Sequence, residues 1–403
     1  MRPGDEGPGP MTTEDPPLPS QDDAPTAQVR RPKNVAELDP PSRLLLGPGP
    51  SPVHPRVMRA LAAPALGHLD PALLELLAET SGLLRGVFRT SNKATLAVSG
   101  TGMAGMEAVL GSLLEPDDRL VVCAAGFFGQ RIAELAARMG AAVTKVEKEW
   151  GQVFTPEEVE AAVAPVRPKA VAIVHAETST GALQPMGGLG EIAHRHGALL
   201  VADCVTSLGG APVEIDGWGV DAAYSGSQKC LGGPSGMAPV TLSPRARDVM
   251  AARRRPAHAW YLDLELLDRY WNGDHAYHHT ISSALVYALR EGLRLVVEEG
   301  LEARFERHQR NAEMLWDGLE AMGLTLHVDA AHRVPSLTTV RVPEGTDEAH
   351  VRARLRDDYG IEIGAGLGPL KGKVWRIGLM GHGSQKPNVI LLLAALVDLL
   401  RKP

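Results

Sequence analysis

Lys229 lies among small residues in the segment 225–233 (SGSQKCLGG), which follows the mostly apolar stretch 220–224. Small neighbours leave room around the amine for a bulky partner. A lysine held where water is scarce loses its proton more easily, and the neutral amine can attack a carbonyl. Taken alone, such a lysine is more often an exposed residue on a glycine-rich turn. The interpretation of Lys229 therefore depends on what other segments bring to it.

Asp203 is the second candidate, because it ends the apolar run 198–202. A carboxylate at the end of a buried strand is costly unless it has a partner. An aspartate that precedes a lysine-bearing segment suits a pyridoxal phosphate site. There the acid keeps the ring nitrogen protonated, and the lysine carries the cofactor covalently. Asp203 and Lys229 are separated by about one crossover or hairpin unit.

A glycine-rich loop, Gly100 to Gly105 (GTGMAG), follows the predicted strand 94–99, and a helix is predicted from this loop to Leu114. Its spacing and context match the dinucleotide-binding fingerprint, so NAD is a rival ligand. That fingerprint needs an acidic residue at the end of the next strand, and the strand 119–125 ends in GFFG instead. Free N–H groups at such a junction bind any phosphate, which favours the phosphate of pyridoxal phosphate.

Strands and helices alternate around these candidates and predict an α/β protein with a mostly parallel sheet and crossover helices. Strands are predicted at 94–99, 119–125, 142–146, 170–175, 198–203, 334–342 and 374–378. Helices are predicted at 55–61, 71–88, 130–139, 156–163, 283–299, 303–322 and 347–359. A chain of 403 residues exceeds the size of one core, so two domains are expected.

The composition of the chain indicates which cellular compartment and which classes of partner it is suited to. Residues 1 to about 40 have almost no large apolar groups and are predicted to be disordered. The net charge of −7 argues against a nucleic-acid surface. Cys123, Cys204 and Cys230 lie in or beside apolar strand sequence, and we interpret them as buried thiols in a reducing compartment, the cytoplasm. No signal peptide is recognised, and the apolar run 389–397 is too short to span a bilayer.

Four motifs give the chain a resemblance to class V aminotransferases of fold type I: LGPGP at 46–50, HAETSTG at 175–181, SGSQK at 225–229 and YHHT at 277–280. The resemblance runs from Leu44 to near the C-terminus. It is strongest with the alanine–glyoxylate and serine–glyoxylate (serine–pyruvate) aminotransferases, and ureidoglycine–glyoxylate enzymes are near. It implies a large pyridoxal-phosphate-binding domain with a mostly parallel seven-stranded sheet at 43–298 and a small C-terminal α+β domain at 299–403, which follow the tail that composition predicts to be disordered, at 1–42.

The resemblance also assigns cofactor contacts, with Lys229 and Asp203 as catalytic residues. The cofactor-binding residues that it implies are Thr101, Gly102, Met103, Phe128, Thr178, Asp203, Val205, Gln228, Lys229, Tyr277 and Thr280. The first three contact the phosphate, Phe128 and Val205 cover the two ring faces, and Thr178 binds the ring hydroxyl. Many relatives have Trp at position 128, and a core Phe is the alternative there. Tyr277 and Thr280 reach the phosphate of the neighbouring subunit, which implies a homodimer with shared sites.

Arg376 is the main candidate for substrate binding, because it lies inside apolar strand sequence, where an unpaired guanidinium is disfavoured. Its fork fits a carboxylate in two parallel hydrogen bonds. By the resemblance it binds the α-carboxylate of the amino acid, and an internal Asp or Glu partner is the alternative. The resemblance also places the LGPGP loop with Gly49, and His68, beside the substrate.

Three other functions fit the sequence less well. His175 and Glu177 could be a metal pair, but no third ligand has sensible spacing, so no metal is expected. Cysteine desulfurases share the fold but need a nucleophilic Cys on a mobile loop, and no Cys follows Cys230. A cofactor-binding regulator usually carries an added DNA-binding domain, and no helix-turn-helix is recognised in the acidic tail.

The predicted reaction is a ping-pong transamination in which Lys229 moves the α-proton and glyoxylate accepts the amino group. Ureidoglycine–glyoxylate enzymes resemble this chain at 149–151 and 287–292, but they have Gln at the position of His68 and Asn at that of Tyr277. Those amides suit a ureido group, which both donates and accepts hydrogen bonds. We therefore expect a compact donor, alanine or serine, with ureidoglycine as the alternative.

Overall fold

The computed structural model describes residues 35–400. The tail predicted to be disordered at 1–42 therefore lies mostly outside the described residues. The fold below is that of the compact unit that begins at Ser42. Within the described range, none of the helices combines the length and the apolar character needed to cross a membrane.

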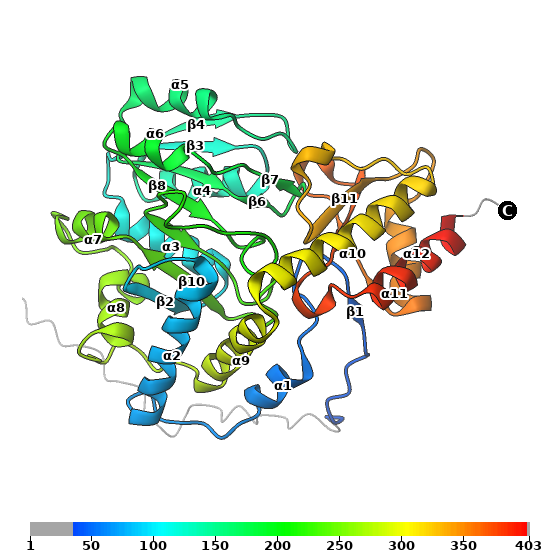
Figure 1. The fold of residues 1–403 in the computed structure, drawn as a ribbon, viewed down its shortest axis with the longest axis horizontal. Coiled ribbons are helices and arrows are strands. Elements are labelled where there is room, and N and C mark those ends of the chain that lie inside the picture. Colours follow the sequence, from blue (N-terminus) through cyan, green and yellow to red (C-terminus); the bar gives the residue numbers. More distant parts are fainter. Residues whose placement is uncertain (1–34, 401–403) are drawn as a thin grey trace, which may run out of the picture. The chain divides into compact units, whose positions relative to one another are not determined.

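A seven-stranded sheet forms the centre of the larger part of this unit (Figure 1). Its strands, in spatial order, are β2 (Ala94–Ser99), β10 (Met237–Leu242), β9 (Ala222–Tyr224), β8 (Leu199–Asp203), β5 (Ala170–Val174), β3 (Arg119–Ala124) and β4 (Ala142–Glu147). Only β10 runs antiparallel to its neighbours. The five middle strands are buried almost throughout, as expected when helices cover both faces of a parallel sheet. The predicted α/β fold with a mostly parallel seven-stranded sheet is confirmed.

The helices of this part pack around the sheet and contribute to one large apolar core. They are α1 (Pro55–Leu61), α2 (Pro71–Phe88), α3 (Gly102–Leu113), α4 (Phe127–Arg138), α5 (Pro156–Val166), α6 (Leu189–Arg195), α7 (Pro244–Ala251), α8 (Leu264–Asn272) and α9 (Ser283–Glu299). Several of these helices begin directly after a residue whose side chain caps the helix N-terminus. The Asp70 side chain accepts from Ala72 N, and Thr155 forms a capping box with Glu158.

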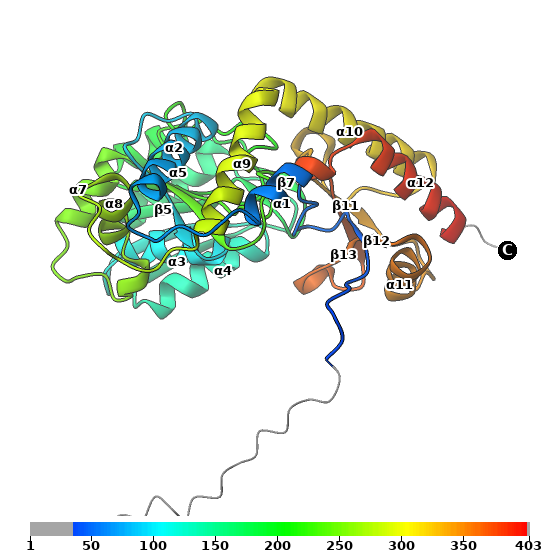
Figure 2. The same cartoon turned by 90° about the horizontal axis from the view of Figure 1, so that it is seen from below.

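A second apolar core lies under a smaller sheet of three antiparallel strands, β11 (Leu337–Arg341), β14 (Val374–Gly378) and β13 (Gly364–Ala365). Its helices are α10 (Leu301–Ala321), α11 (Glu348–Tyr359) and α12 (Lys386–Leu400). Strand β1 (Leu44–Leu45) pairs in parallel with β12 (Ile361–Glu362), so the start of the unit packs with this second core. Figure 2 shows α10 running from the end of α9 toward α12. The domain division at 298/299 stays a prediction.

Candidate active site

The candidate residues gather at the carboxyl ends of neighbouring parallel strands, where open α/β sheets bind ligands. Asp203 is the last residue of β8, and Lys229 lies on the turn that follows β9. Thr178 follows the short strand β6 (Ala176–Glu177), which comes directly after β5 and pairs with β7 (Ala182–Leu183). The glycine loop at Gly100 to Gly102 joins β2 to α3.

Lys229 is buried, with 9% of its surface exposed, and its Nζ contacts the carbonyl oxygen of Pro48. Ser51 holds the backbone of the same segment: its N–H donates to Gln228 O at 2.9 Å, and its Oγ donates to Lys229 O at 2.8 Å. Burial and, to a smaller extent, the nearby charge of Arg376 lower the pKa of Lys229 to about 8. A substantial fraction of the amine is therefore neutral near physiological pH.

Gly49 lies directly against this lysine. A Cβ at position 49 would come within 2.6 Å of the Lys229 Nζ, and the backbone φ of 108° also favours glycine. The LGPGP loop can therefore approach the amine only because this position lacks a side chain.

Asp203 is 2% exposed, and its Oδ1 accepts a hydrogen bond of 2.9 Å from Val205 N. Burial raises the pKa of its carboxyl to about 7, against the opposing effects of the Val205 bond, the Tyr224 hydroxyl and the charge of Lys229. Tyr224 lies opposite Asp203 in the β8–β9 register, and its hydroxyl is buried close to this carboxyl. A cationic ring nitrogen beside Asp203 would offset the cost of burying the ionised carboxylate.

The N-terminus of α3 is an open anion site. Thr101 is the N-cap residue but makes no capping bond, and in the described chain the N–H groups of Gly102 and Met103 have no partner. A Cβ at position 102 would meet Val205 Cγ2 at 2.9 Å, so only glycine fits between the loop and Val205. The buried Oε1 of Gln228 likewise finds no partner in this part of the chain. These unused groups fit the phosphate and ring of pyridoxal phosphate.

Glu177 has a structural role that the sequence did not reveal. Its Oε2 accepts from Phe128 N at 3.1 Å and Gly129 N at 3.3 Å, and its Oε1 accepts from Ser179 N and Oγ at 3.0 and 2.6 Å. The carboxylate thus caps α4, whose own N-cap residue, Gly126, has no side chain. For this reason α4 begins at Phe127, three residues before the predicted start at 130.

Phe128 consequently lies in the first turn of a helix and not at the end of a strand, which corrects the expectation. It is half-buried and packs against the large core. Thr178, next to Glu177, is buried with its Oγ1 against the Oγ1 of Thr206. Glu177 therefore joins the Phe128 helix to the Thr178 turn, and its bonds are to backbone N–H groups and a serine hydroxyl.

Arg376 extends from β14 and is 7% exposed. Its Nε donates to Ala365 O at 2.7 Å and its Nη1 to Thr178 O at 3.0 Å. Among residues 35–400 no carboxylate lies within 4 Å of it, so the internal acidic partner weighed above is not found. Burial lowers the pKa of this guanidinium to about 10, with Glu177 acting in the opposite direction. It remains charged at neutral pH and can bind an anionic group.

Three expected residues lie apart from this buried group in the single chain. The rings of His68 and Tyr277 have centroids 4.9 Å apart, while Tyr277 is 57% exposed and Thr280 is also exposed. No hydrogen bond joins any of the three to Lys229 or Asp203 in the part of the chain described. The YHHT segment is anchored by His279, whose Nε2 lies 2.7 Å from the Oγ of Ser99, just before the glycine loop.

Comparison with known proteins identifies related enzymes. The sequence model of the family described as aminotransferase class-V matches residues 56–373. The (S)-ureidoglycine–glyoxylate transaminase of Bacillus subtilis is 44% identical over 378 residues, which cover 89% of this chain and 91% of that protein. Rabbit (Oryctolagus cuniculus) alanine–glyoxylate aminotransferase is 41% identical over 382 residues, or 94% and 96% of the two chains. The crystal structure of alanine–glyoxylate aminotransferase from Nostoc sp. superposes with a TM-score of 0.90 at 50% identity, covering 92% and 98%.

Proposed function

Because the chain belongs to the class V aminotransferases, which use pyridoxal 5′-phosphate, we propose that it transfers the amino group of a small α-amino acid to glyoxylate, giving glycine and a 2-oxo acid. The observation that carries this proposal is the presence in one site of a buried amine, Lys229, and of a buried guanidinium, Arg376, whose charge acts on that amine and which has no acidic partner within residues 35–400. One group can move a proton while the other binds a carboxylate. The three relatives described above each act on glyoxylate according to their names, which supports this acceptor.

When bound, pyridoxal phosphate supplies an aldehyde that takes up the amino group and a ring that withdraws electrons from the reacting carbon. The free N–H groups of Gly102 and Met103, with Thr101, would bind its phosphate, and Gln228 would add an amide beside them. Asp203 would keep the ring nitrogen protonated. Val205 and Phe128 would pack against the ring, and Thr178 would bind its hydroxyl.

Lys229 is the general base and acid of the reaction in this proposal. With a pKa lowered to about 8, its neutral amine can accept the α-proton, and the resulting ammonium can return a proton to the product. Arg376 orients the substrate by its carboxylate, so that the α-carbon faces the lysine. The contact of Lys229 with Pro48 O and the closeness of Gly49 leave little room for water at the amine.

The donor that we propose is alanine or serine. His68 and Tyr277, the residues that differ from ureidoglycine enzymes, have rings 4.9 Å apart, so both substitutions alter one small region. This region offers one hydroxyl and an imidazole, where two amides would serve a ureido group better. Ureidoglycine remains the second candidate, because the Bacillus subtilis relative at 44% identity carries that name.

The test is a competition in which glyoxylate is supplied with equal amounts of alanine, serine and freshly generated ureidoglycine. The proposal expects alanine or serine to be consumed fastest, because positions 68 and 277 offer no amide to a ureido group. Consumption of ureidoglycine more than ~10-fold faster than either amino acid, about 1.4 kcal/mol of differential transition-state binding, would select the second candidate. A double substitution, H68Q with Y277N, provides the matched variant and should shift the preference toward ureidoglycine.

The homodimer with shared sites is part of the proposal. Exposed Tyr277 and Thr280 belong to a segment that presents further exposed aromatic side chains, Trp260 and Tyr261. Mixed Thr280→Ala and Lys229→Ala chains should regain activity by forming dimers with one intact shared site, measured against each variant alone. An active monomer in sedimentation would contradict sharing. A cytoplasmic location is proposed on the three buried thiols alone.

A further inference from the structure

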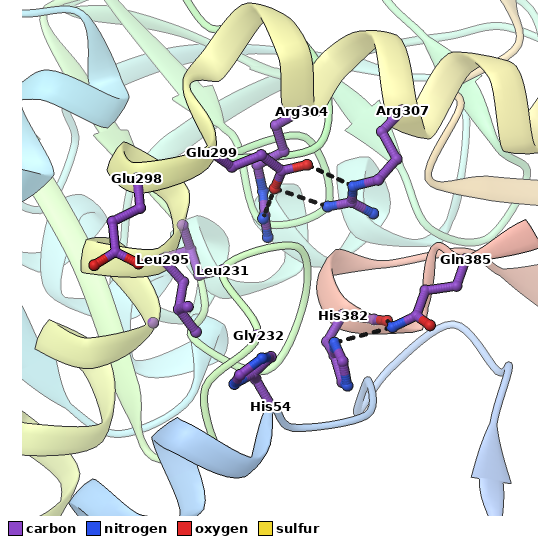
Figure 3. Close-up of a pocket in the computed structure, with 11 residues that line it drawn as sticks. His54, Leu231, Gly232, Leu295, Glu298, Glu299, Arg304, Arg307, His382 and Gln385 are labelled. Atoms are coloured by element: carbon purple, nitrogen blue, oxygen red, sulfur yellow. Dashed lines mark hydrogen bonds and ion pairs between the residues drawn. The ribbon is translucent and has the colours of Figure 1, made fainter.

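A cluster of three charged side chains lies where α9 ends and α10 begins (Figure 3). Glu299 is the last residue of α9, and Arg304 and Arg307 lie in the first two turns of α10. Arg304 Nη1 donates to Glu299 Oε2 at 2.6 Å. Arg307 donates through Nε to Oε1 at 2.5 Å and through Nη2 to Oε2 at 3.0 Å. The carboxylate therefore holds both guanidinium groups in fixed orientations.

Arg304 connects this cluster to the two segments that carry the proposed catalytic pair. Its Nη2 donates to Cys230 O at 2.6 Å, and Cys230 directly follows Lys229. Its Nε donates to Gly209 O at 2.8 Å, on the loop that starts at Asp203. Since Arg304 is only 5% exposed, both contacts lie away from solvent. One guanidinium thus fixes the backbone beside Lys229 relative to the loop after Asp203.

Arg307 connects the same cluster to the smaller sheet. Its Nη1 donates to Gly381 O at 3.1 Å and Ser384 O at 2.5 Å. Gly381 begins the turn that follows β14, the strand that carries Arg376. His308 adds a further bond, because its Nε2 accepts from Gly381 N at 3.1 Å. The cluster therefore bonds the segments that follow Lys229 and Asp203 and also the turn that follows the strand of Arg376.

The opposite charges of the cluster keep Glu299 ionised at neutral pH. Burial acts to raise the pKa of Glu299, but the hydrogen bond from Arg307 and the two guanidinium charges outweigh it and lower the pKa to about 2. Burial lowers the pKa of Arg304, and the charge of Glu299 opposes that change. Buried ion pairs often stabilise a fold no more than apolar residues of the same volume. We infer that the main contribution of these side chains is to orient the backbone segments that they bond, rather than to stabilise the fold.

We propose that Arg304 is a positioning residue for the transamination, which sets Lys229 relative to Asp203 and, through Glu299 and Arg307, relative to Arg376. This inference rests on the roles proposed for Lys229 and Asp203. Arg304 acts through the carbonyls of Cys230 and Gly209, so its importance depends on the fold and is not visible in the sequence.

A cavity next to Arg304 makes the inference testable by chemical rescue. The cavity has a volume of about 440 Å³, and its lining includes Arg304, His54, Gly232 and His382 (Figure 3). Arg304→Ala would enlarge this cavity by the volume of the removed side chain. A free guanidinium ion could then enter from it and donate to the two carbonyls and to Glu299, whereas urea has the same shape but no charge.

The experiment compares holoenzymes of the wild type, Arg304→Ala and Arg304→Lys. In Arg304→Ala we expect turnover to fall by at least ~10-fold, with a smaller change in the donor KM. The pH at which the visible absorbance of the bound cofactor titrates should also shift. Guanidinium at millimolar, non-denaturing concentration should restore turnover and the titration, and urea should restore neither. Arg352→Ala, which removes a pair with Glu348 on α11, is the matched control and should change neither property.

Wild-type turnover and titration in Arg304→Ala would overturn the inference, and so would a loss of turnover that guanidinium does not restore while the cofactor stays bound. Should Arg304→Ala fail to fold, Arg304→Lys decides, because it keeps the charge but has a single nitrogen, which cannot reach the three acceptors that Nε, Nη1 and Nη2 of Arg304 bind. An unshifted titration in that variant would overturn the proposal. Lys229→Ala, measured in parallel, separates this outcome from a failure of the proposed function.

Discussion

The side chain of Ser51 donates a hydrogen bond of 2.8 Å to the backbone carbonyl of Lys229, which lies 178 residues later in the chain. A second bond, from Ser51 N to Gln228 O at 2.9 Å, runs beside it. The segment that begins the folded unit therefore fixes the backbone of the proposed catalytic lysine. The same segment brings Pro48 O to the amine, so that both ends of the Lys229 residue contact residues 48–51.

Replacing Ser51 by Ala should destabilise the protein by about 1–2 kcal/mol, because Lys229 O is left buried without its hydrogen-bond donor. Urea unfolding of the apoenzyme measures this change. Ser91→Ala is the control, since its Oγ bonds the exposed Asp216 and its loss should change the free energy of unfolding by less than about 0.5 kcal/mol. Equal stabilities for the two variants would contradict the role of Ser51.

Glu177→Gln should weaken cofactor binding by at least ~10-fold, about 1.4 kcal/mol. The uncharged amide has one acceptor oxygen where the carboxylate uses two, so the N–H groups of α4 or of Ser179 lose their partner. Equilibrium dialysis of the apoenzyme against pyridoxal phosphate measures the dissociation constant. The matched control, Glu134→Gln, lies exposed on the same helix and should bind as the wild type does.

The sequence predicts the bounds of a helix well when the residues that set them lie next to the helix in the chain. Helices α1, α2 and α9 have the predicted bounds, because Pro55, Asp70 and Gly300 mark their ends within a few residues. The start of α4 was missed because its cap, Glu177, comes from a segment about fifty residues later.

In the candidate site, too, the sequence identifies only those residues whose own neighbours in the chain mark them. Lys229, Asp203 and Arg376 could be singled out because each is a charged residue in apolar or small-residue sequence. Ser51 and Arg304 have no such signal, since their importance comes from the carbonyls that the fold brings to them. The contacts expected of Tyr277 and Thr280 belong to a second subunit, so they stay predictions for a dimer.

Asp203 should make the stability of the apoenzyme depend on pH. Its folded pKa, about 7, is above its ordinary value of 3.8, so the native state binds more protons in this range and the free energy of unfolding falls as pH rises from 3.8 toward 7. Asp203→Asn cannot titrate and should lack this slope. Urea unfolding of both apoproteins across the range gives the difference, and parallel curves would show that Asp203 titrates normally.

Arg376→Lys should lower kcat/KM for the amino donor by at least ~10-fold, about 1.4 kcal/mol, because lysine keeps the charge but loses the two-pronged carboxylate contact. Steady-state kinetics with alanine and serine test this expectation. Arg333→Lys is the control, because its guanidinium pairs with Glu320 on the surface of α10. An unchanged kcat/KM in Arg376→Lys would reject its role in binding the carboxylate.

The most direct test of the whole account is the absorbance of Lys229→Ala. Purified wild-type protein should be yellow and carry the visible absorbance of a covalently bound cofactor near neutral pH. Lys229→Ala should lose both this absorbance and turnover with glyoxylate, because Lys229 is the residue that we propose to supply the amine to the cofactor. Lys148→Ala, which removes an amine that pairs with Glu158 at the surface, should retain both. Full activity and unchanged absorbance in Lys229→Ala would contradict the account.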